Sequence, residues 1–204
     1  MFGKIAADAL GLSDIGSVIA PADYDKVDAD DYVMHEDQEK IFFLIKSKSD
    51  EYCFTNKALI HLDGTSAASK KRMLRRYNYS SNPISGVMLE TAGTMDMDVE
   101  IKFRLGQRDF SIDVHKKHLK EVKDLYKALF RISELMTENE IALGHAKASL
   151  EVASATLGRG QAGQAPIVES FKELNQAAFS WLAGAQQKYW VKDFGAVFER
   201  YIKS

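Results

Sequence analysis

The sequence predicts an α+β fold in which short antiparallel strands come first and helices follow. Apolar residues recur at every second position from about Lys40 to His115, and with a helical period after His115. The alternating half contains seven short apolar runs separated by turn residues, which is typical of an antiparallel barrel or sandwich rather than a parallel sheet. We therefore expect a seven-stranded antiparallel barrel or sandwich covered at one end by a helix, with an α-helical hairpin after it.

The strands follow from the alternation and from the turns between the apolar runs. In the clearest case, Met97, Val99 and Ile101 are the apolar members of a run whose other positions are charged. Residues 106–109 form a turn, after which the alternation resumes, so these two runs predict a hairpin. The seven predicted strands are 41–45, 52–55, 59–62, 73–79, 87–91, 96–105 and 110–114.

The helical part begins with an apolar stripe over residues 119–132, which we interpret as the helix that covers one barrel opening. Thr137 and Glu140 have the spacing of a capping box and predict the start of a second helix. Residues 158–166 contain a G-x-G-x-x-G match, but a helix precedes it instead of a strand, so we interpret it as an interhelical turn. We expect a domain over residues 1–132 and a helical hairpin over residues 133–204.

Composition and charge exclude several classes of protein. The 204 residues carry 27 Lys and Arg against 29 Asp and Glu, a net charge of −2 that argues against nucleic-acid binding. The lone Cys53 excludes an intrachain disulfide and a cysteine-cluster zinc site. No apolar run has the length of a membrane span, and Asp8 and Asp14 interrupt the apolar N-terminus, so neither a span nor a signal peptide is predicted. We expect a cytoplasmic protein.

Catalytic chemistry has little support in the sequence. Asp113, His115 and His118 form the only local cluster of metal-ligand residue types, and no third convergent ligand accompanies the two histidines. Cys53 lies within a predicted strand, where a lone cysteine behaves as a small apolar residue. No nucleophile-elbow, phosphate-loop or kinase signature is present. We expect no enzyme activity, no metal and no cofactor.

The last predicted helix, over residues 167–204, has an unusually aromatic stripe that contains both tryptophans. An Ala-rich partner helix over residues 136–157 has too little surface to cover so many rings, which predicts burial against another subunit. Packing onto the barrel of the same chain is the alternative. The predicted oligomer interface consists of Phe171, Leu174, Trp181, Tyr189, Trp190, Phe194, Phe198 and Tyr201.

Charged residues form two opposed clusters. Residues 21–40 contain eight acids and two bases, a net charge of −6, whereas five bases lie within residues 70–76. These five bases are the candidate anion-binding residues Lys70, Lys71, Arg72, Arg75 and Arg76. Such a cluster can bind anionic lipid headgroups, or dock an acidic protein such as the acidic segment of a neighbouring subunit. The simplest alternative is a solvated edge strand protected by its charge.

Several short motifs resemble those of bacterial pleckstrin-homology (PH) domains. They are Phe54-Thr55-Asn56-Lys57-Ala58-Leu59-Ile60, Asp63-Gly64, Lys70-Lys71, Pro83-Ile84 and Glu90-Thr91-Ala92-Gly93. The resemblance covers residues 1–132, and the remainder resembles the helical oligomerisation extension of YvbH-like bacterial proteins.

The resemblance implies a bent seven-stranded barrel, no catalytic activity and self-association. Many eukaryotic PH domains bind phosphoinositides through the loop between their first two strands, but here this loop, residues 46–51, has two bases and two acids. We expect a homo-oligomeric scaffold with a ring-like assembly as one arrangement. The alternative is a peripheral sensor of an anionic ligand at the inner face of the membrane.

Overall fold

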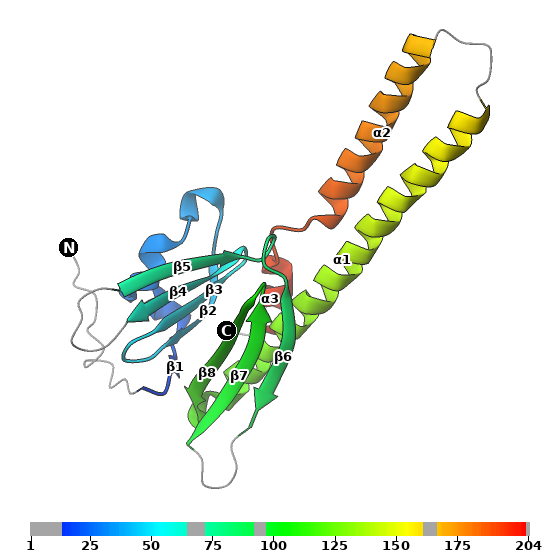
Figure 1. Ribbon diagram of the computed structural model, residues 1–204. Coiled ribbons are helices and arrows are strands. Elements are labelled where there is room, and N and C mark those ends of the chain that lie inside the picture. The colour runs from blue at the N-terminus through cyan, green and yellow to red at the C-terminus, as the bar shows by residue number, and fades with distance from the viewer. Residues whose placement is uncertain (1–13, 65–71, 92–96, 161–166, 203–204) are drawn as a thin grey trace. The chain divides into compact units, whose positions relative to one another are not determined.

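The computed structural model describes residues 14–64, 72–91, 97–160 and 167–202 (Figure 1). It divides into a first unit of Met1–Glu134 with Lys192–Ser204 and a second unit of Leu135–Val191. The strands are β1 (Ser17–Val18), β2 (Ile41–Lys46), β3 (Glu51–Thr55), β4 (Ala58–Gly64), β5 (Arg72–Asn78), β6 (Ile84–Glu90), β7 (Asp98–Leu105) and β8 (Arg108–His115). The helices are η2 (Pro21–Lys26), η3 (Asp28–Tyr32), η4 (His35–Asp37), η5 (Lys116–His118), α1 (Leu119–Gly160), α2 (Ile167–Tyr189) and α3 (Gly195–Tyr201).

The seven predicted strands correspond to β2–β8, and all neighbouring strands pair in the antiparallel sense. They form a five-stranded sheet, β1–β5, and a three-stranded sheet, β6–β8. The α+β class and the antiparallel strands are confirmed, but the predicted barrel does not close, because no ladder joins β5 to β6 in the described strands. A register shift in β6 between Ser85 and Met88, with Gly86 at a φ of 60°, bends the strand next to this opening.

The two sheets are joined at one corner through Gly16. Its backbone N–H donates to the carbonyl of Asp113 at 2.9 Å, and its carbonyl accepts from the N–H of His115 at 2.8 Å. A Cβ atom at residue 16 would lie 2.6 Å from Ile45 Cγ2, closer than real contacts allow. The absence of a side chain at residue 16 therefore lets the chain lie close to both β8 and Ile45 of β2 just before β1 begins.

Aromatic and aliphatic side chains fill the space between the two sheets. Phe54 of β3 lies 6.0 Å from Phe103 of β7, and Phe103 stacks on Phe110 of β8 at 5.1 Å between ring centroids. In β7, Val99, Ile101, Phe103 and Leu105 are buried and alternate with more exposed positions. The apolar residues that alternate from Val99 to Leu105 in the sequence are thus the residues on the buried face of the strand.

The other face of the five-stranded sheet is covered by the segment that contains η2, η3 and η4. Val27, Ala29 and Val33 of this segment form a buried cluster with side chains such as Cys53 and Ile60. Sequence analysis identified the segment by its acidic residues alone. Its three small apolar residues hold it against the sheet.

The first turns of α1 bury the predicted apolar stripe, with Val122, Leu125, Ala128, Leu129 and Ile132 completely inaccessible. The helix then continues without a break to Gly160, so the predicted helix start at Thr137 is wrong. An unbroken helix satisfies its own backbone hydrogen bonds, and a capping side chain has no free N–H to bind there.

The second unit is a helical hairpin, made by the later part of α1 and by α2, which run side by side (Figure 1). The indole Nε1 of Trp181 donates to the carbonyl of Ala146 at 3.0 Å. Helix α2 ends at Tyr189, and the structure assigns residues 192–204 to the first unit, which differs from the predicted hairpin over 133–204. Residues 161–166 of the predicted joint lie outside the described residues.

Candidate functional site

The arginines of the predicted anion-binding cluster all face carboxylates of the same chain. Arg72 pairs with Asp28 and lies 3.4 Å from Glu51, and Arg75 pairs with Asp63 at 2.6 Å. Lys70 and Lys71 lie outside the described residues. The described part of the cluster is therefore already compensated within the chain.

The third arginine, Arg76, forms a two-pronged ion pair with the buried Glu39. Its Nη1 and Nη2 donate to the two carboxylate oxygens of Glu39 at 3.0 and 2.9 Å. Glu39, of which 1% is exposed, also accepts hydrogen bonds from the Thr55 hydroxyl and from the N–H of Met34. Burial by itself would raise the pKa of Glu39, but these hydrogen bonds outweigh it and lower the pKa below its ordinary value.

A second buried carboxylate, Glu51, has the same kind of partners. It accepts from the N–H of Ala29 at 2.8 Å and pairs with the buried Lys46. Glu39 and Glu51 thus each bind one backbone N–H of the acidic segment and one arginine of β5. Both carboxylates therefore have their hydrogen-bond partners within the chain, and these bonds fix the acidic segment to the sheet. Arg72 and Arg76, which pair with them, have little capacity left to bind a separate anion.

The hairpin displays the largest exposed aromatic side chains in the described part of the chain. Among the predicted interface residues, Phe171 is 69% exposed, Trp181 53% and Trp190 44%, and Leu174 is exposed to a lesser degree. Tyr189 is half-buried. Sequence analysis missed Phe179, which is also 69% exposed, because it lies one position outside the stripe that was followed along the helix.

Phe194 and Phe198 do not belong to that surface, which corrects the predicted interface. Both are buried in the first unit, where Phe198 stacks on Phe42 at 5.4 Å and Phe194 lies 6.0 Å from Tyr79. Tyr201, in the same segment, is half-buried there. The aromatic pattern runs through residues 171–201, but the helix breaks after Tyr189, so its last members enter a different core.

Polar contacts hold this C-terminal segment in place. The amide Nδ2 of Asn56 donates to Asp193 Oδ2 at 2.6 Å, and the N–H of Phe194 donates to the carbonyl of Asn56 at 2.8 Å. Asp193 Oδ1 also accepts from the N–H of Gly195 at the start of α3. The core of the first unit is therefore completed by residues that follow the hairpin.

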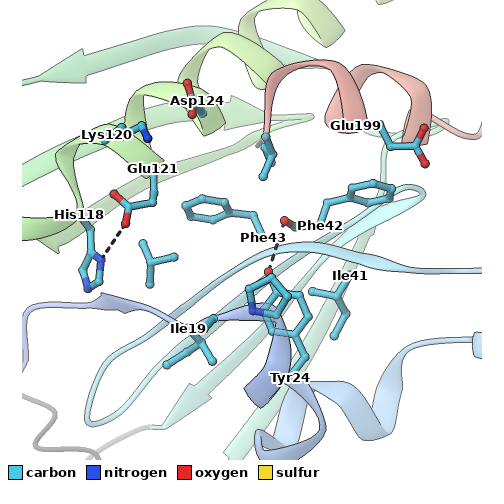
Figure 2. A pocket seen from close by; sticks show the side chains of 14 residues that line it. Ile19, Tyr24, Ile41, Phe42, Phe43, His118, Lys120, Glu121, Asp124 and Glu199 are labelled. Carbon is cyan, nitrogen blue, oxygen red and sulfur yellow. Dashed lines mark hydrogen bonds and ion pairs between the residues drawn. The ribbon is translucent and has the colours of Figure 1, made fainter. Parts of the chain in front are cut away.

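The first unit also contains a pocket of about 710 Å³ between β1, η2, β2, the start of α1 and α3 (Figure 2). Its apolar lining includes Ile19, Ile41 and Phe43, whereas Glu121 and Glu199 contribute carboxylates from the helices. Its lining comes from four stretches of the chain, 18–24, 41–43, 118–124 and 199–202, and no local motif in the sequence indicates it.

The residues considered for catalysis or metal binding do not converge. His115 Nδ1 accepts from the N–H of Lys117, and His118 Nδ1 lies 3.6 Å from Glu121. Within the described ranges, no group of three or more His, Cys, Asp or Glu side chains is placed to hold a metal ion. Burial raises the pKa of the Cys53 thiol, which keeps it protonated.

Among the described residues, no helix has the length and apolar character needed to cross a bilayer.

Comparison with known proteins agrees with this architecture. A family model described as "Bacterial PH domain" matches residues 9–133, and one described as "YvbH-like oligomerisation region" matches residues 144–204. The uncharacterized protein YvbH of Bacillus subtilis (strain 168) is 58% identical over the full length of both chains.

A crystal structure of a PH-domain-containing protein from Exiguobacterium sibiricum is 54% identical, with a TM-score of 0.87 over 93% of this chain and 100% of that one. Both relatives thus cover nearly all of this chain, whereas the two family models match its first and last parts separately. The chain belongs to the bacterial PH domain family and carries a YvbH-like oligomerisation region after that domain.

Proposed function

We propose that this protein is a non-enzymatic scaffold whose copies associate through the exposed aromatic side chains of α2 and of its C-terminal end. The observation that carries the proposal is the exposure of Phe171, Phe179 and Trp181 on α2 and of Trp190 directly after it. Aromatic residues are enriched at interfaces, and large exposed apolar surfaces on a folded protein mark interaction sites. The match to an oligomerisation region supports a second copy of this chain as the partner.

The composition of the hairpin supports association between identical copies. Residues 135–191 contain five acidic and four basic residues, so two hairpins meet with little electrostatic repulsion. A pair of helices also has a small core of its own, and packing against further helices stabilises it. Association therefore covers the aromatic side chains and adds stability to the hairpin.

Light scattering coupled to size exclusion tests the proposal on the full chain. The triple variant Phe171→Ser, Phe179→Ser and Trp190→Ser should reduce the mass to that of one chain, 22.8 kDa. A matched control, Met73→Ser with Met88→Ser, alters exposed apolar residues of the first unit and should leave the mass unchanged. A wild-type protein that is monomeric at all concentrations, or an unchanged mass in the triple variant, contradicts the proposal.

The alternative function, a peripheral sensor of an anionic ligand, has less support, because Arg72, Arg75 and Arg76 are paired within the chain. It depends on Lys70 and Lys71. Pelleting with anionic and neutral liposomes distinguishes the two functions. Salt-sensitive binding to anionic liposomes that is lost in Lys70→Gln with Lys71→Gln would favour the sensor, and an absence of binding at low salt would leave the scaffold.

A further inference from the structure

We propose that the pocket of the first unit binds a small amphiphile with an apolar chain and a protonated amine. None of its lining residues belongs to the hairpin or to the arginines of β5. Its volume of about 710 Å³ lies in the range of small-molecule sites, and every residue that lines it belongs to the first unit.

The interior of the pocket suits an apolar chain. Ile19 and Phe43 are buried, and Ile41 and Ile202 extend the same apolar surface. Tyr24 adds its ring, and its hydroxyl donates to the carbonyl of Phe42 at 3.4 Å, so this polar atom is engaged with the protein itself. An alkyl chain therefore gains hydrophobic contact without displacing a strong hydrogen bond of the ligand-free protein.

The helical side of the pocket carries an excess of negative charge. Figure 2 shows the carboxylates of Asp124 and Glu199 on the side formed by α1 and α3, opposite Tyr24 and Ile41. Glu121 is the third lining carboxylate, and Lys120 is the one lining ammonium group among the described residues.

Nearby groups reduce this excess without reversing it. Asp124 pairs with Lys127 at 2.9 Å, which compensates one carboxylate. His118 lies 3.6 Å from Glu121, but burial lowers its pKa, so the imidazole is largely neutral at pH 7. The remaining field favours a cationic head group over an anionic one.

The aromatic rings are consistent with the same head group. Phe42 lines the pocket beside α3, where it stacks on Phe198 at 5.4 Å, and an ammonium group is attracted to the face of such a ring. Carboxylates and aromatic rings together provide the two chemistries that recognise an alkylammonium ion. A carboxylate head group would gain neither interaction.

Isothermal titration calorimetry of the full-length protein tests the proposal with three probes of equal chain length below their micelle concentrations. These are decylammonium, decanoate and decanol. Decylammonium should bind with one site per chain and about tenfold more tightly than decanoate, because the two head groups differ in sign at a partly exposed charged site. The affinity for decanol should lie between those for decylammonium and decanoate. Equal or tighter binding of decanoate, or no binding of decylammonium, would overturn the proposal.

Two sets of variants locate the site. Val18→Phe narrows the pocket and should reduce decylammonium affinity at least tenfold, and Ala20→Trp, at an exposed lining position, provides a second obstruction if the first variant unfolds. Glu121→Gln with Glu199→Gln should remove most of the preference for the amine.

The matched control, Glu169→Gln with Glu173→Gln, makes the same change in net charge on α2 and should leave the preference intact. If this control changes the preference as much as the pocket variants do, or if both obstructing variants bind like wild type, the amine binds elsewhere and the proposal fails.

Discussion

Replacing Phe198 with alanine should destabilise the first unit and leave the association of copies intact. Phe198 is completely buried, stacks on Phe42 at 5.4 Å and lies 6.3 Å from Tyr79. Removing a buried phenylalanine ring costs about 3–5 kcal/mol, because transfer energy and packing are both lost. We expect a loss of about 4 kcal/mol, which for a domain of this size lowers Tm by about 10 °C.

Urea unfolding followed by circular dichroism measures this loss, while tryptophan fluorescence reports on the second unit, where both tryptophans lie. Phe171→Ala is the matched control, since the same ring is removed from an exposed position and the first unit should keep its urea midpoint. If Phe198→Ala instead left the midpoint unchanged and reduced the mass in light scattering, Phe198 would lie between copies and our assignment of residues 192–204 would be refuted.

Three further predictions concern the contacts of the first unit. Glu39→Gln should cost about 2 kcal/mol at pH 7, because Arg76 loses its charged partner at a largely buried site. Since the folded-state pKa of Glu39 is lowered, its stabilisation is present above the unfolded pKa and disappears as pH falls through the folded pKa. The difference between the urea midpoints of variant and wild type should therefore shrink as the pH is lowered from 7 into the acid range, and a difference that stays constant with pH would contradict this. Asp193→Ala should cost about 1 kcal/mol through loss of the Asn56 hydrogen bond, measured in the same assay, and an unchanged midpoint would show that the contact is not stabilising. Replacing residues 135–191 with a Gly/Ser linker should yield a folded monomer by circular dichroism and light scattering, and persistence of the oligomer would place the contact in the first unit.

The seven strands and the first helix could be predicted because local periodicity reflects which face of each element is buried. Val99 to Leu105 alternates in the sequence and in its exposure, and the stripe that contains Val122 and Ile132 is buried. Met97, which the same alternation placed on the buried face, is 62% exposed because it lies just before β7 begins. A period of two or 3.6 needs no knowledge of the partner surface, since it depends only on one side being apolar. The composition and these periods were enough to predict an α+β protein with a helical extension.

Which surface each apolar or charged residue meets depended on the tertiary structure. Phe171 and Phe198 belong to the same aromatic pattern, yet one is exposed on α2 and the other completes the core of the first unit. Arg76 had the same sequence signature as a ligand-binding arginine, and the fold brings Glu39 to it from 37 residues away. Periodicity within one segment determines which face of that segment is apolar. Burial and ion pairing depend on pairs of segments that are distant in the sequence, so only the folded chain decides what that face contacts.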